Sequence, residues 1–115
     1  MEVLNHHIYE YKKGLRNLVL HTICSDKIES AKQKLARQHI NFCVQKVSER
    51  KFNIFFGKRE CVNIANEFTH KSLSDLTAEE DFMLGIMLGY DCMQQCQRYI
   101  TKKGQFIDNM KLIRV

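Results

Sequence analysis

The segment from Thr77 to Ile100 restricts the possible folds of this chain more than any other, because a helix start leads directly into a long apolar run. Thr77 and Glu80 have the spacing of a capping box, in which each side chain accepts a hydrogen bond from the other residue's backbone N–H. Residues 82–90 are almost entirely apolar. Since a helix that is apolar all round must be buried, we expect this one to contact the rest of the domain, a partner, or both.

Two glycines interrupt this run at helical spacing. Gly85 and Gly89 would each cost about 1 kcal/mol relative to alanine inside a helix, so a close approach of another element should offset them. The expected contact face carries Gly85, Gly89, Cys92 or Met93, and Cys96. This face is either packed within one subunit or a subunit interface, for which the candidate residues are Gly85, Gly89, Met93 and Cys96. Alternatively, residues 89–91 form a corner between two helices. Acidic residues at 79–81 and at 91 leave too short an apolar stretch for a membrane span.

Two earlier segments also have signals for a helix start. Asn5 is placed to cap a short helix through Tyr11, although alternation over these residues also fits a strand. Gly14 is expected to end this element. Asp26 and Glu29 repeat the capping-box spacing and predict a helix to about residue 38, with Ile28, Ala31, Leu35 and Ala36 on one face.

Apolar spacing predicts the remaining elements. They are a buried strand within 15–23, a hairpin of strands at 42–47 and 52–56 around the polar turn 48–50, and a helix over 61–68. This order predicts an α+β fold, in which a small sheet of about three strands is covered by helices and followed by a long C-terminal helix or helix pair. The end of the chain, 105–115, is amphipathic, and Leu112–Val115 fits an edge strand or a frayed end.

Length and cysteine usage indicate one domain in a reducing compartment. The chain has 115 residues, 44% of them hydrophobic, and no proline-rich or glycine-rich linker, so we expect a single domain over 1–115. Five scattered cysteines fit reduced thiols better than a disulfide framework. No run resembles a signal peptide, which favours the cytoplasm.

The sequence contains no compact catalytic or metal-binding motif. Cys92 and Cys96 are the one close pair of potential ligands, whereas a zinc site needs about four. His6 and His7 are adjacent and would point in different directions. The acids at 79–81 stand at a helix start, where they complement the helix dipole. We therefore expect no catalytic residues, no metal, no cofactor and no enzymatic activity.

Charge gives the clearest indication of a partner. The net charge of +5 and pI near 9.0 favour acidic partners. The candidate docking residues are Lys12, Lys13, Arg16, Lys58 and Arg59. We expect an acidic protein as partner, with RNA or DNA as the alternative and a small-ligand or metal-dependent enzyme as a third. Exposed phenylalanines at 52, 55 and 56 would favour nucleic acid, but alternation assigns Phe52 and Phe56 to the core.

Several segments resemble one family. Residues 6–16 (HHIYEYKKGLR) and 18–22 (LVLHT) resemble its opening. Residues 79–85 (EEDFMLG), 87–91 (MLGYD), 95–96 (QC) and 98–99 (RY) resemble its closing segment. The family is a small bacterial one, catalogued as domain of unknown function twenty twenty-three. The similarity spans 3–103 and leaves 104–115 as an extension. It implies three strands, several helices and a homodimer, with no established activity. Flavodoxin-type electron carriers are associated with the family as gene neighbours, which makes flavodoxin an example of the expected acidic partner.

Overall fold

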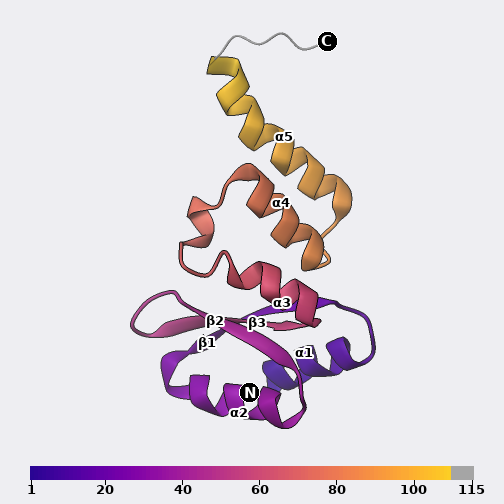
Figure 1. Ribbon diagram of the computed structural model, residues 1–115, viewed down its shortest axis with the longest axis vertical. Coiled ribbons are helices and arrows are strands. Elements are labelled where there is room, and N and C mark those ends of the chain that lie inside the picture. The colour runs from indigo at the N-terminus through magenta and orange to yellow at the C-terminus, as the bar shows by residue number, and fades with distance from the viewer. Residues whose placement is uncertain (110–115) are drawn as a thin grey trace.

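Three strands and five α-helices form the described part of this protein, as expected for an α+β fold. The computed structural model describes residues 1–109, with side chains as far as Gly104. Figure 1 shows α1 and α2 on one face of the sheet, α3 on the other, and α4 and α5 stacked beyond α3. The elements are α1 (Glu2–Lys12), β1 (Leu18–Cys24), η1 (Ser25–Lys27), α2 (Ile28–Arg37), β2 (Asn41–Lys46), β3 (Lys51–Gly57), α3 (Arg59–Asn66), η2 (Leu73–Asp75), α4 (Ala78–Met87) and α5 (Cys92–Asn109).

The sheet has β3 at its centre. Its strand order is β1-β3-β2, and both pairs are antiparallel. The predicted hairpin is confirmed: β2 and β3 are joined through Ser48–Arg50, and the Ser48 amide donates to the Lys51 carbonyl at 3.1 Å. Because β3 has a neighbour on each side and helices on both faces, its residues from Asn53 to Gly57 are all buried.

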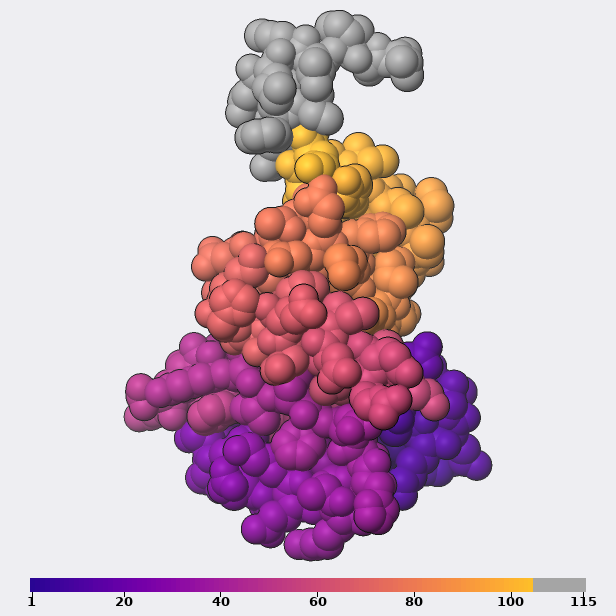
Figure 2. Space-filling view, in the orientation of Figure 1, coloured from indigo at the N-terminus to yellow at the C-terminus, as the bar shows by residue number. Residues whose placement is uncertain are grey.

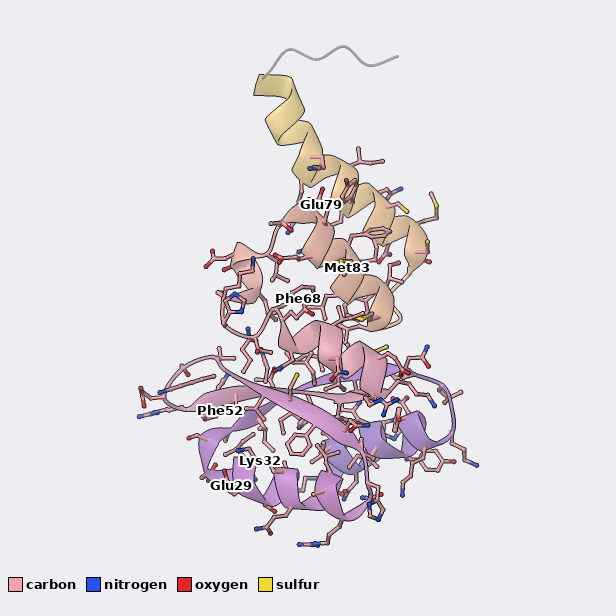
Figure 3. The ribbon with its side chains drawn as sticks, viewed as in Figure 1. Glu29, Lys32, Phe52, Phe68, Glu79 and Met83 are labelled. Atoms are coloured by element: carbon pink, nitrogen blue, oxygen red, sulfur yellow. The ribbon has the colours of Figure 1, made fainter. Side chains whose placement is uncertain are left out.

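The face of the sheet toward α1 and α2 carries the first apolar cluster. Alternate residues of β3 point to this face, so Ile54 and Phe56 are fully buried here and Phe52 packs at the margin. Figure 3 shows Phe52 on the side of the sheet where Glu29 and Lys32 of α2 lie. The core assignment of Phe52 and Phe56 is confirmed. The buried members of this cluster are Leu4, Ile8, Val19, Ile23, Ile28, Ala31, Leu35, Ile40, Ile54 and Phe56.

The opposite face carries a second cluster, beneath α3 and α4. Phe55 projects here between its register partners Leu20 and Cys43. Phe68, after the end of α3, lies between the sheet layer and α4 (Figure 3). The buried members are Leu18, Phe55, Val62, Ala65, Phe68, Leu76, Leu84 and Leu88. One central strand thus supplies aromatic anchors to both faces.

A chain of polar side chains, buried at Gln45 and Asn53, crosses the same face near the hairpin. The Thr22 hydroxyl donates to Asn53 at 2.6 Å, and the Asn53 amide donates to Gln45 at 2.8 Å. Gln45 in turn donates to the Lys71 carbonyl at 2.7 Å. These bonds join all three strands to the loop that follows α3. Simple alternation did not predict buried Gln45 and Asn53, because it assigns polar residues of a strand to solvent.

The helix start at Thr77 is confirmed. The Glu80 amide donates to the Thr77 hydroxyl at 3.1 Å, and the Thr77 amide donates to the Glu80 carboxylate at 3.0 Å. Lys71 lies 2.6 Å from the same carboxylate, so α4 is tied to the loop after α3. The hydrogen bond from Lys71 and that from the Thr77 backbone hold the pKa of Glu80 below its ordinary value.

The helix-start interpretations at Asn5 and Asp26 are wrong. Helix α1 begins at Glu2, and Asn5 lies inside it, accepting instead a hydrogen bond from Lys34 at 2.6 Å. The strand alternative is wrong as well, because Leu4 and Ile8, four residues apart, bury one helical face. Residues Ser25–Lys27 form a 3-10 turn, so α2 begins at Ile28 without a side-chain cap. Ala36, placed on the inner face, is exposed.

The apolar segment is two helices rather than one. Helix α4 ends just before Gly89, whose φ of +81° turns the chain out of the helix. The Tyr90 amide then donates to the Gly85 carbonyl at 3.1 Å, which closes the end of the helix. Asp91 then accepts from the Gln94 amide at 3.0 Å and caps α5. The corner at 89–91 is therefore confirmed, and the continuous helix is wrong.

The two helices form an antiparallel hairpin that lengthens the molecule to 53 × 32 × 22 Å (Figure 2). The expected edge strand or frayed end at Leu112–Val115 lies outside the described residues. None of the described helices combines the length and apolarity needed to cross a membrane.

Candidate functional site

The structure brings the two groups of candidate docking residues together at one corner. Antiparallel pairing places Gly57, the end of β3, opposite Leu18, the start of β1. The Lys58 amide then donates to the Asn17 carbonyl at 2.9 Å, which fixes the start of α3 against the loop after α1. We call Lys12, Lys13, Arg16, Lys58 and Arg59 the basic corner.

Two tyrosines of α1, Tyr9 and Tyr11, lie beside the basic corner. The ammonium of Lys58 lies 5.8 Å from the centroid of the Tyr11 ring, and that of Lys13 lies 5.5 Å from the Tyr9 ring. Tyr9 is 56% exposed. Cations over aromatic faces gain electrostatic energy while they stay accessible to an approaching anion. The sequence analysis missed both tyrosines, although their helical proximity to Lys13 was a usable signal.

Only one cation of the basic corner is neutralised by an ion pair within the described residues. Arg16 lies 3.5 Å from Glu10, which also approaches His6 at 3.4 Å. The remaining four members are exposed and form no ion pair with a described acidic side chain. In the α4–α5 hairpin, by contrast, each basic residue with a described side chain is paired. Lys103 binds Glu79, whereas Arg98 and Lys102 bind Asp81. The basic corner therefore carries four cations without an ion pair, whereas the described part of the α4–α5 hairpin carries none. Lys27, Lys34, Arg37, Arg50 and Lys51, on α2 and beside the β2–β3 turn, also form no ion pair with a described acidic side chain.

Of the four candidate interface residues, only Met93 and Cys96 share one face. Gly85 faces into the chain, where the Gln95 side chain packs so closely that a Cβ at 85 would overlap its amide oxygen. Gly89 lies at the corner with open space around it, and Met93 is exposed on α5. Cys96 lines a groove on the far side of the hairpin. The reversal of the chain at Gly89 separates residues that a continuous helix would have aligned.

The hairpin nevertheless has an apolar outer face. An open groove of about 490 Å³ lies between the two helices, with Met83 of α4 on its wall (Figure 3). Met93 and Ile100, seven residues apart on α5, are 64% and 65% exposed. We define the outer face as Phe82, Met83, Met93, Cys96, Tyr99 and Ile100.

In three of the cysteines, Cys43, Cys61 and Cys96, the surroundings disfavour the thiolate. Burial raises the pKa of Cys43 to about 11, and burial with the neighbouring Glu60 raises the pKa of Cys61. Burial and the adjacent Cys92 thiol raise the pKa of Cys96. A reactive cysteine requires the opposite shift, because the thiolate is the nucleophile.

Burial and neighbouring charges also shift the pKa values of His21 and Asp81. Burial, with a smaller contribution from His7, lowers the pKa of His21, whose ring lies 5.4 Å from that of His7. Burial would raise the pKa of Asp81, but the hydrogen bond from Arg98 and the charge of Lys102 leave it below its ordinary value. Among the described side chains, no three His, Cys, Asp or Glu residues come together to hold a metal ion.

One family model matches most of the chain. It is described as "Protein of unknown function (DUF2023)" and covers residues 2–102, nearly the range in which the resemblance was found. No curated protein is significantly similar to the chain. The match carries no activity, so the function of the basic corner has to be argued from its geometry.

Proposed function

The chain belongs to the DUF2023 family of proteins of unknown function, and we propose that it is a binding domain that docks an acidic protein at its basic corner. The convergence of residues 12–16 with residues 58–59 through the Lys58–Asn17 hydrogen bond carries this proposal. A concentrated charge steers an oppositely charged partner and accelerates association. Five free thiols support a reducing, cytoplasmic location.

Charge reversal at the basic corner should slow association. For the variant Lys12→Glu with Lys13→Glu, we expect the on-rate for an acidic protein such as a flavodoxin to fall about tenfold at low salt. Both side chains are exposed, so the thermal midpoint should stay nearly unchanged. Stopped-flow measurements at several salt concentrations would give the rates. The wild-type on-rate should itself fall as salt is added, because salt screens the attraction.

A matched control lies at the opposite end of β3. Arg50→Glu with Lys51→Glu makes the same change in net charge, but both residues are beside the hairpin turn. This control should retain most of the wild-type rate. Equal loss in both variants would mean that net charge matters and the basic corner does not. Titration with mixed single-stranded RNA separates the alternative partner: binding to RNA but not to the acidic protein would replace the proposal with a nucleic-acid function.

We also propose that two chains associate through the outer face. Helix α4 is apolar on two sides, since Leu84 and Leu88 pack toward the second cluster while Met83 stays accessible. The ion pair Glu79–Lys103 lies at the edge of the apolar groove, so a negative and a positive charge are balanced there. A balanced rim around an apolar centre suits a two-fold contact, in which the same surface meets its own copy.

Light scattering at tens of micromolar should give twice the mass of one chain. The variant Met93→Glu with Ile100→Glu should be monomeric and still folded, because both side chains are exposed in the single chain. Met93→Leu with Ile100→Leu keeps the face apolar and is the matched control. A monomeric wild type would refute the association, and the outer face would then need another explanation.

A further inference from the structure

Two histidines meet where α1 packs on the sheet (Figure 1). The rings of His7, on α1, and His21, on β1, lie edge to face with their centroids 5.4 Å apart. The Nδ1 atom of His7 is buried and has no hydrogen-bond partner among the described residues. The Glu10 carboxylate is 3.7 Å from this nitrogen, too far for a hydrogen bond. The contact between helix and strand therefore includes two rings whose charge changes near neutral pH.

The sheet offers His21 no counter-ion, because β1, β2 and β3 contain no acidic residue. Its register partner on β3 is Ile54, and Val19 and Ile23 lie beside it on the same face of β1. Burial, the charge of His7 and the charge of the chain's amino group lower the pKa of His21, in that order. Folding therefore favours the neutral ring, and this preference costs stability once the pH falls below 6.5, the ordinary pKa of histidine.

On the helix side, the carboxylate of Glu10 is shared among three groups. It lies 3.4 Å from His6, 3.7 Å from His7 and 3.5 Å from Arg16. Helix α2 adds a cation, since the Lys34 ammonium also reaches α1. At acidic pH, one carboxylate would thus face a guanidinium and two imidazolium rings. A proton on each ring of the pair would then place two positive charges at the 5.4 Å contact without an acid on the sheet to balance them.

We propose that the contact between His7 and His21 is an acid-sensitive switch, which keeps α1 on the sheet while both rings are neutral and loosens it when both are charged. Only Leu4 and Ile8 of this helix are buried, so α1 is attached to the domain by few apolar side chains. A charge at the contact should therefore affect α1 before it affects the rest of the fold. Helix α1 carries part of the basic corner, so its release would also disrupt that surface. This last consequence rests on the proposed function, whereas the release of α1 does not.

Hydrogen exchange of the full-length protein at about pH 7.5 and about pH 5.0 tests the switch. After correction for the intrinsic exchange rates, protection of the α1 amides should fall about tenfold at the lower pH, while protection in α4 stays nearly constant. The acids at 79–81 do not interfere in this range. Folding lowers their pKa values from 4.5 for the glutamates and 3.8 for the aspartate, so the stability that they contribute is retained at pH 5.0.

Removal of either ring should abolish most of the pH dependence. His7→Gln should also move the titration of the His21 ring, followed by NMR, toward pH 6.5, because the charge of His7 lowers that pKa. His21→Gln changes the contact from the strand, so the test does not depend on one variant. His6→Gln is the matched control, since His6 also lies beside Glu10 but its side chain is 67% exposed.

The control should behave as the wild type does. Unchanged protection of α1 at pH 5.0 in the wild type would overturn the proposal. An equal loss of protection in α1 and α4 would indicate global unfolding and would overturn it too, as would an equal effect of His6→Gln and His7→Gln. None of these measurements involves a partner, so docking of an acidic protein at the basic corner stands or falls separately.

Discussion

Alanine at position 57 should destabilise the protein by about 3 kcal/mol, as the sum of two unfavourable changes at one site. Gly57 has φ +148°, a conformation that costs a residue with a side chain about 1–3 kcal/mol. A Cβ there would also overlap the carbonyl of Asn17. Overpacking against a neighbour that cannot move typically costs another 1–3 kcal/mol or so. The carbonyl is held in place because it accepts the hydrogen bond from the Lys58 amide.

Urea unfolding followed by circular dichroism would measure this loss. Gly104→Ala is the appropriate control, since Gly104 lies inside α5 with nothing within 4 Å of an added Cβ. That substitution should stabilise the protein by up to about 1 kcal/mol, the helix-propensity difference. If Gly57→Ala were as stable as the wild type, the close approach of β3 to the loop before β1 would be wrong, and the basic corner would lose its structural basis.

The substitution Phe55→Ala should lower the free energy of unfolding by about 3–5 kcal/mol, the usual range for a fully buried phenylalanine replaced by alanine. Phe55 is 1% exposed and lies in the second cluster, where α3 and the loop before α4 cover it. The cavity left in the centre of the sheet cannot collapse easily, because both register partners of Phe55 belong to the same sheet. Equilibrium unfolding in urea gives the change in free energy.

Phe52→Ala is the matched control for this loss. Phe52 is on the same strand but only half-buried at the margin of the first cluster, so its truncation should cost clearly less. Hydrogen exchange adds a spatial test: Phe55→Ala should reduce protection in α4 more than in α1, since α1 packs on the other face. Equal costs for the two substitutions would contradict the division into two clusters.

Local signals in the sequence were good predictors where the interaction is local. The Thr77–Glu80 capping box joins residues three apart and forms as expected. The same spacing at Asp26 and Glu29 failed because Ser25–Lys27 follow β1 directly and take a 3-10 turn. Gly89 could be read as a helix interior or as a helix end. A glycine is compatible with the interior of a helix and with its end. Which of the two Gly89 occupies depends on the chain reversal that packs Gln95 onto Gly85.

The candidate sites depended on long-range contacts and were therefore only partly predictable. The sequence identified the basic residues at 12–16 and 58–59. Their convergence follows from the pairing of β1 with β3, which no local pattern specifies. Nothing in the sequence predicted that Gln95 is buried, because a glutamine on an amphipathic helix normally faces water. It is buried only because α4 folds back against α5.

The central position of β3 also determines when the sheet can assemble during synthesis. The first two strands to leave the ribosome, β1 and β2, are not neighbours in the sheet. A nascent chain that ends before Lys51 therefore has helices and two edge strands but no ladder between them. The β2–β3 hairpin closes over a few residues and is fast to form, whereas docking of β1 must close a longer loop. We expect emergence of β3 to trigger assembly of the sheet and, with it, of both apolar clusters.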